Sequence, residues 1–141
     1  MAGKTNPSLV SLFSGAGGMD IGFEKAGFKT IWANEYDKTI TPSYRNYFQN
    51  TPLDERSICD ISDTDIPNSS IGVISGPPCQ SWSEAGAKRG ISDPRGALFF
   101  QYLRVIQKTQ PLRNAYKMIG NAVPVNLAFF IAKKIKEDLE L

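Results

Sequence analysis

Short apolar runs alternate with amphipathic stretches along this chain of 141 residues. Three of the runs have the length and composition of buried β-strands: Ser8–Phe13, Lys29–Ala33 and Ile71–Ser75. A shorter extended piece is predicted at Ser57–Cys59. Because the strands are apolar along their length rather than at alternate positions, they favour a parallel sheet that is covered on both faces.

The stretches between and after these runs have helical patterns: Met19–Ala26, Thr39–Phe48, Gly96–Gln107 and Val125–Leu139. Gly27 closes the first helix as a natural left-handed cap, and the second helix opens around Pro42. Strands that alternate with helices predict an α/β fold, with a mostly parallel sheet flanked by helices.

The last two helices carry apolar stripes that predict which of their faces is buried. In the third helix, five residues have core spacing: Leu98, Phe99, Tyr102, Leu103 and Ile106. In the fourth helix, the apolar face consists of Leu127, Ile131 and Ile135, and the lysines are expected to point outward: Lys133, Lys134 and Lys136.

Composition excludes several kinds of catalytic site. Hydrophobic residues make up 41% and charged residues 21%, as in an average globular protein, and the net charge of +2 neither requires nor excludes a polyanionic partner. The sequence has no His, which excludes Ser-His-Asp and Cys-His catalysis and every His-ligated metal site. Two cysteines are too few for a disulfide framework or a four-thiolate zinc site, so no metal is predicted.

The hydropathy pattern also bears on location. No apolar stretch has the length of a signal-peptide core or a membrane span, so we expect a cytoplasmic protein without membrane contact. Thiols stay reduced there, and Cys59 is interpreted as a small buried hydrophobe.

The first candidate for chemistry is the strand–turn–helix at Phe13–Gly18, where glycines let the backbone approach a ligand and the next helix offers free N–H groups. Glu35 follows at the end of the second strand, where a carboxylate can accept both ribose hydroxyls of a nucleoside-containing cofactor. The segment has neither the dinucleotide glycine pattern nor the Lys of a P-loop. The alternative is a tight turn that binds nothing.

The second candidate is Gly76–Ser83, which begins where the third strand ends. Pro77 and Pro78 stiffen the backbone at the sheet edge where α/β proteins bind ligands. Cys79 follows on this stiff turn, beside the polar, glycine-rich stretch Gln80–Pro94, which is expected to form a mobile loop. This placement suits a nucleophile better than a buried structural thiol.

Five strings in this order together resemble the cytosine-C5 DNA methyltransferases: Phe13–Gly18, Asn34–Asp37, Asp60–Ile61, Gly76–Ser81 and Ile119–Pro124. The amino-acid sequence at Gln80–Glu84 and Tyr116–Met118 is most similar to that of bacterial restriction-modification methylases that modify GGCC. The resemblance implies a Rossmann-like fold that depends on S-adenosylmethionine, and the transfer of its methyl group to cytosine in duplex DNA.

The resemblance also implies roles for individual residues. Cys79 would be the catalytic nucleophile, adding as a thiolate to C6 of a flipped-out cytosine. Phe13 would stack on adenine, Glu35 would hold the ribose, and the other cofactor-binding residues would be Ser14, Gly15, Ala16, Gly17, Gly18, Tyr36, Asp60, Ile61, Pro77, Asn121 and Val123. The loop after Cys79 would close over DNA through Gln80, Ser81, Ser83, Lys88 and Arg89, its cations touching phosphates.

The chain departs from the family pattern in one region. Where residues 109–116 stand, the family has a strand with Glu-Asn-Val, an Arg-containing motif, further strands and a target-recognition domain. Residues 1–141 are therefore interpreted as a partial catalytic domain with a deletion join near 109–116, weak or inactive alone. The deletion is expected to leave the Ile71–Ser75 strand with a bare outer edge. Two alternatives stay open: an S-adenosylmethionine-binding subunit completed by a complementing methyltransferase chain, and an RNA cytosine methyltransferase.

Overall fold

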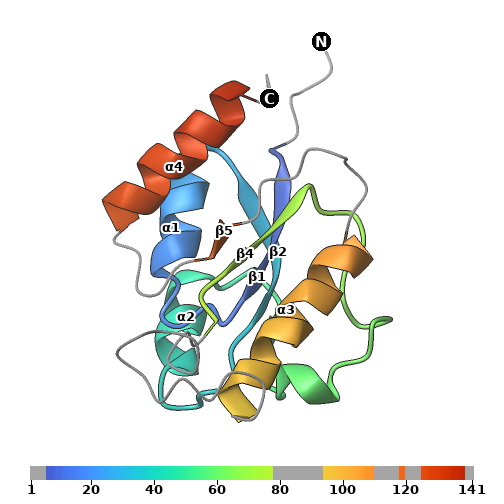
Figure 1. The fold of residues 1–141 in the computed structure, drawn as a ribbon. Coiled ribbons are helices and arrows are strands. Elements are labelled where there is room, and N and C mark those ends of the chain that lie inside the picture. Colours follow the sequence, from blue (N-terminus) through green and yellow to red (C-terminus); the bar gives the residue numbers. More distant parts are fainter. Residues whose placement is uncertain (1–5, 78–93, 110–117, 120–124, 139–141) are drawn as a thin grey trace.

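The computed structural model describes residues 6–77, 94–109, 118–119 and 125–138 (Figure 1). Its five strands are parallel and lie in the order β3-β2-β1-β4-β5. The central strand, β1 (Ser8–Leu12), pairs with β2 (Lys29–Asn34) on one side and with β4 (Gly72–Ser75) on the other. The edges are two short strands, β3 (Leu53–Asp54) and β5 (Met118–Ile119). The predicted parallel sheet is confirmed.

All four predicted helices are present, as α1 (Gly18–Lys25), α2 (Thr41–Tyr47), α3 (Pro94–Thr109) and α4 (Val125–Asp138). Helix α3 covers one side of the sheet and α1 and α4 cover the other, so the fold has three layers (Figure 1). Within the described residues, no helix combines the length and apolar character that a membrane crossing needs.

The face of the sheet under α3 holds the larger core cluster. Val10, Trp32 and Val73 of the strands pack there against the stripe predicted for α3. In that stripe Tyr102 and Ile106 are buried, and the remaining members are partly buried at its rim: Leu98, Phe99 and Leu103. Val105, which the predicted stripe omits, is also fully buried.

The opposite face is closed by α1 and α4, and the end of α1 explains how the chain turns back into the sheet. Gly27 has a φ of 85°, as expected for a left-handed cap. Its N–H donates to the Glu24 carbonyl at 2.9 Å, and the Phe28 N–H donates to the Phe23 carbonyl at 3.1 Å. The rings of Phe23 and Phe28 meet edge to face at 5.4 Å between centroids, which buries the hydrophobic contact that accompanies this cap.

Two expectations for the Ser57–Cys59 stretch are wrong. The chain forms a 3₁₀ turn, η1 (Ile58–Asp60), instead of an extended piece, because the Ser57 hydroxyl caps it by accepting the Cys59 N–H at 3.3 Å. Cys59 is exposed on this turn, and is therefore not a buried hydrophobe.

Two further corrections concern β4 and α4. The outer edge of β4 is not bare, because Ile74 and Ser75 pair with Met118 and Ile119 of β5. Lys136 does not point freely outward: it is partly buried, and its Nζ donates to the Ala26 carbonyl at 3.5 Å, at the C-terminal end of α1. A cation is favoured there because the carbonyl groups of the last turn carry partial negative charge.

Candidate functional site

A pocket of about 360 Å³ opens at the carboxyl ends of β1 and β4. After β1 the chain builds the sheet outward through β2 in one direction, and β4 lies on the opposite side of β1. Ligands of open α/β sheets bind in the crevice at such a reversal of strand order. The pocket is lined by the end of β1, the turn that follows, the start of α1, and Ser75 and Gly76.

The turn between β1 and α1 has a left-handed backbone at three places: φ is 50° at Phe13, 57° at Gly15 and 88° at Gly17. Glycine takes this conformation without strain, whereas a bulky residue such as Phe13 is held there at a cost of about 1–3 kcal/mol. The Ser14 N–H donates to the Asn34 carbonyl at 3.2 Å, which anchors the turn to the end of β2. Such strain is typical of functional turns.

Glu35 ties the second strand to this turn. Its Oε2 accepts the Gly15 N–H at 2.8 Å, and its Oε1 accepts the Asp37 N–H at 2.8 Å. Each carboxylate oxygen keeps a further lone pair, and the side chain is only partly buried. Glu35 can therefore accept ligand hydroxyls beside Gly15, which lines the pocket.

Asp20, in the first turn of α1, is a fully buried carboxylate beside the pocket. Its Oδ2 accepts the Ser11 hydroxyl at 2.9 Å, and its Oδ1 accepts the hydroxyls of Thr30 at 3.2 Å and Tyr44 at 2.9 Å. These hydrogen bonds join β1, β2 and α2 to α1. Burial, only partly offset by the hydroxyls of Tyr44, Ser11 and Thr30, raises the pKa of Asp20 to about 6.

This raised pKa predicts a pH-dependent stability. The native state binds a proton at Asp20 more readily than the unfolded chain does, so the free energy of unfolding falls as pH rises from about 4 to about 6. The shift corresponds to about 3 kcal/mol. The Asp20→Asn side chain cannot take up this proton. Between pH 4 and pH 7, the free energy of unfolding of the wild-type chain in urea denaturation should therefore fall by about 3 kcal/mol relative to that of the variant. Parallel pH profiles for the two proteins would contradict the assignment.

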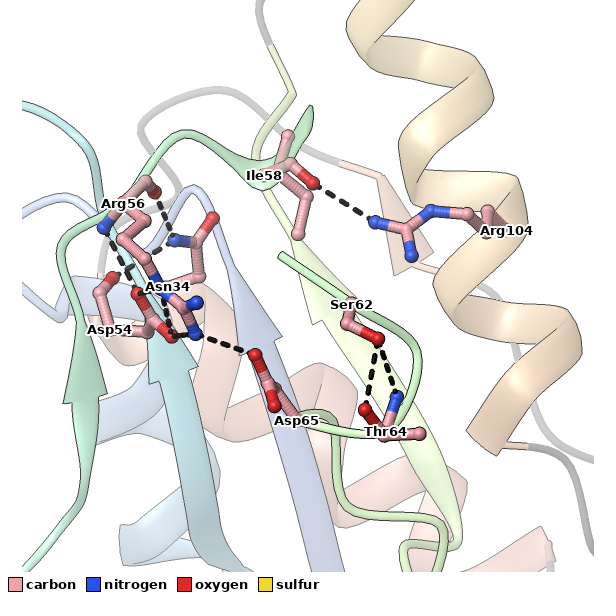
Figure 2. A network of polar contacts seen from close by, with 8 residues as sticks. All are labelled: Asn34, Asp54, Arg56, Ile58, Ser62, Thr64, Asp65 and Arg104. Carbon is pink, nitrogen blue, oxygen red and sulfur yellow. Dashed lines mark hydrogen bonds and ion pairs between the residues drawn. The ribbon is translucent and has the colours of Figure 1, made fainter. Parts of the chain in front are cut away.

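The segment that carries Asp60 and Ile61 is fixed by a polar network (Figure 2). The Asn34 side-chain amide donates to the carbonyls of Asp54 and Arg56, both at 2.9 Å. The Arg56 guanidinium pairs in turn with the carboxylates of Asp54 and Asp65. From α3, Arg104 donates to the Ile58 carbonyl at 2.9 Å. The network holds η1 between the ends of β2 and β3 and the α3 helix.

The structure brings only part of the predicted cofactor site together. Phe13, Ser14, Gly15, Ala16 and Gly18 line the pocket, and Gly17 lies within the same turn. Other predicted members lie around it with different exposures: Pro77 is buried just after Gly76, and Asp60 and Tyr36 are exposed. Ile61 is 3% exposed in the core under α3, so its side chain is a packing residue there.

Other predicted site residues lie outside the described residues: Cys79, Gln80, Ser81, Ser83, Lys88, Arg89, Asn121 and Val123. Their roles remain predictions. Within the described part of the chain, no group of three or more acidic or Cys side chains could hold a metal ion.

Sequence reasoning missed Ser11, Asp20 and Ser75 as lining residues. Asp20 had one available signal, an acidic residue in the first turn of a helix that follows a glycine-rich loop. That position ordinarily indicates a helix-dipole contact at the surface. Its burial depends on hydroxyls that come from three other elements of the fold.

The residues at the pocket fit S-adenosylmethionine, the cofactor that the resemblance implies. A volume of about 360 Å³ is in the range of small-molecule sites. Leu12, Phe13 and Met19 supply apolar walls for an adenine ring or a thioether chain, and Glu35 supplies acceptors for ribose hydroxyls. Asp20 adds negative charge to a pocket that would hold the positively charged sulfonium of S-adenosylmethionine.

Comparisons with known proteins point to one family. Residues 8–113 match the family described as C-5 cytosine-specific DNA methylase. The type II methyltransferase M.NgoPII of Neisseria gonorrhoeae is 55% identical over 107 residues, which are 75% of this chain and 31% of that protein. M.FnuDI of Fusobacterium nucleatum is 55% identical over 103 residues, 73% of this chain and 29% of that protein. The chain thus spans about a third of the length of these relatives.

Solved structures support the same assignment. A protein described as a DNA modification methyltransferase encoded within an E. coli prophage superposes with a TM-score of 0.61 and 27% identity, covering 76% of this chain and 30% of that one. A DNMT2 variant of Spodoptera frugiperda superposes with a TM-score of 0.61 and 20% identity, covering 92% of this chain and 41% of that one, which shows the fold alone. The Rossmann-like methyltransferase fold is confirmed, and the chain belongs to the C-5 cytosine-specific DNA methylase family.

Proposed function

We propose that this chain is the cofactor-binding part of a type II cytosine-C5 DNA methyltransferase, and that its pocket binds S-adenosylmethionine. One observation carries the proposal. A pocket at the reversal of strand order is bounded by a glycine turn whose Gly15 N–H is held by the Glu35 carboxylate. That arrangement puts a hydroxyl acceptor and an aromatic ring, Phe13, at the same pocket, which suits an adenosine group.

Within the pocket, the described residues have separate tasks. Phe13 supplies a face for adenine, Glu35 accepts the ribose hydroxyls, and the Ser14–Gly18 backbone shapes the floor. Asp60, exposed on η1, is available to the adenine amino group, and Pro77 is available to the ring. Tyr36 is two-thirds exposed and would border the ribose from solvent. For Ile61 we assign only a backbone contact, because its side chain is in the core.

The reacting residue in this proposal is Cys79. Its thiolate would add to C6 of an extruded cytosine and make C5 nucleophilic. C5 would then take the methyl group, and loss of the C5 proton would expel the thiolate from C6. S-adenosylmethionine supplies an electrophilic methyl group when it is bound. Gln80, Ser81, Ser83, Lys88 and Arg89 contact the DNA, and Asn121 and Val123 complete the cofactor site.

The substrate and partners follow from the family. The relatives are named type II methyltransferases, and the matching family is a DNA methylase, so duplex DNA is the substrate we propose and RNA is not. The complete enzyme would act in the bacterial cytoplasm in a restriction-modification system. The chain spans 31% of M.NgoPII, and in the complete enzyme base recognition would come from sequence outside residues 1–141, in one proposal from a complementing methyltransferase chain.

Glu35→Ala tests the pocket directly. The substitution removes the ribose acceptor and frees the Gly15 N–H that the carboxylate holds. Hydrogen bonds to a charged group contribute about 1.5–3 kcal/mol, so the dissociation constant for S-adenosylmethionine should rise about 10- to 100-fold in isothermal titration calorimetry.

Glu55→Ala is the matched control, because the Glu55 carboxylate pairs with Arg45 at 2.8 Å and does not line the pocket. Its affinity should equal that of the wild-type chain. Equal affinities for all three proteins would remove Glu35 from the site, and a wild-type chain that binds no S-adenosylmethionine would overturn the proposed function.

A further inference from the structure

Asp20 has no cationic partner among the described residues, unlike the carboxylates that form ion pairs there. Asp54 and Asp65 pair with Arg56, Glu55 pairs with Arg45, and Asp63 pairs with Arg104. The hydrogen-bond partners of Asp20 are neutral hydroxyls from Ser11, Thr30 and Tyr44. Within the described residues no Lys or Arg contacts it. A buried carboxylate without a cation is costly, and it is expected to attract one.

The place of Asp20 indicates where such a cation would sit. Asp20 and its partner Ser11 both line the pocket, while its own side chain is fully shielded from water. Among the described lining residues, Asp20 is the only one with an ionisable side chain. Asp20 therefore contributes negative charge to the pocket, and because its side chain is shielded from water that charge is little screened.

We propose that Asp20 is a counter-charge of the bound sulfonium and strengthens binding of the cationic methyl donor relative to its neutral thioether product. The inference rests on the proposed function. S-Adenosylmethionine and S-adenosylhomocysteine differ by one methyl group and one positive charge at sulfur. Contacts to adenine, ribose and the amino-acid end are shared by the two ligands, so groups near the sulfur have to tell them apart.

Asp20→Asn separates this charge from the hydrogen bonds. An amide oxygen in the place of Oδ1 accepts from Thr30 and Tyr44 as before, and the amide nitrogen can donate to the Ser11 hydroxyl. The junction of β1, β2, α1 and α2 then keeps its hydrogen bonds, while the charge of Asp20 is lost and that of Glu35 remains. A purely structural role for Asp20 predicts no change in ligand preference.

The experiment measures dissociation constants for S-adenosylmethionine and S-adenosylhomocysteine by calorimetry at pH 8. At an effective dielectric of about 20, an opposite charge within about 10 Å changes a binding equilibrium by tenfold or more. Asp20→Asn should therefore weaken S-adenosylmethionine at least tenfold and leave S-adenosylhomocysteine within about twofold. Glu24→Gln, which neutralises a carboxylate on α1 that does not line the pocket, should leave both constants unchanged.

Ser11→Ala keeps the charge and removes one hydrogen bond, so it should leave the ratio of the two constants unchanged. A ratio that stays the same in Asp20→Asn, or that changes equally in Glu24→Gln, overturns the inference and leaves the proposed function intact. A wild-type chain that binds neither ligand overturns both.

A pH series on the wild-type chain gives the same test without a substitution. The preference for S-adenosylmethionine should fall several-fold between pH 8 and pH 5, as Asp20 takes up a proton. Other groups near Asp20 are the Tyr44 phenol of α2, whose pKa burial holds above its usual range, and Glu24 on α1, which faces Lys29 of β2. Lys136 of α4 lies at the far end of α1. Glu24→Gln measured in parallel removes the contribution of Glu24, and a constant preference across the series counts against Asp20.

Discussion

Purified alone, the chain is expected to bind S-adenosylmethionine and to leave duplex DNA unmethylated. In the deletion proposed near residues 109–116, the chain lacks the Glu that would protonate the cytosine ring and the Arg that would orient it. Loss of a general acid costs about 10²- to 10⁴-fold, and loss of a target-recognition domain removes most base-edge contacts. Tritiated methyl transfer to duplex DNA should therefore stay at background, while calorimetry still detects the cofactor.

Adding the missing part of the enzyme as a separate polypeptide tests why the chain alone should be inactive. The part of M.NgoPII that lies beyond its match to this chain, expressed separately and added, should restore label to cytosine C5. Cys79→Ser in this chain should abolish the restored activity and leave cofactor binding unchanged, because the thiolate acts on the base. Cys79-dependent methylation by the unmixed chain would show that the missing residues are not needed.

Local signals predicted the parts of the fold that fix the pocket. The strand at Ser8–Phe13, its glycine turn and the helix closed by Gly27 are encoded within a few residues of one another, and all three are confirmed. The strands β3 and β5 have two residues each, too few to show any periodicity. The error over the outer edge of β4 follows directly from this, because β5 was not foreseen.

Non-local contacts account for what the sequence did not reveal in the site. The left-handed backbone of Phe13 depends on the β1–α1 turn being tied to the end of β2 through Asn34 and Glu35. The buried state of Asp20 needs Ser11, Thr30 and Tyr44, which are 9, 10 and 24 residues away. A sequence pattern places an acidic residue after a glycine loop, and only the assembled sheet shows that it is buried beside the pocket.

Gly17→Ala should destabilise the chain by about 2–5 kcal/mol, a large share of a small domain's stability. Gly17 has a φ of 88°, where a Cβ costs about 1–2 kcal/mol. A Cβ there would also lie 2.5 Å from Phe48 Cε2 and 3.1 Å from Tyr44 Cδ2, both buried and stacked on each other at 4.5 Å. Moving them adds about 1–3 kcal/mol of overpacking and disturbs the hydroxyl that Tyr44 donates to Asp20.

Gly15→Ala separates the two causes, because its φ is 57° but a Cβ there would meet nothing within 4 Å. Only the backbone term remains, so the loss should be about 1–2 kcal/mol by urea denaturation. Phe48→Leu in the Gly17→Ala background should then recover part of the larger loss, since it removes the atom that the new Cβ strikes. Equal losses for the two alanine variants would mean that the α2 aromatics yield freely, and the tight junction between the cofactor turn and α2 would have to be abandoned.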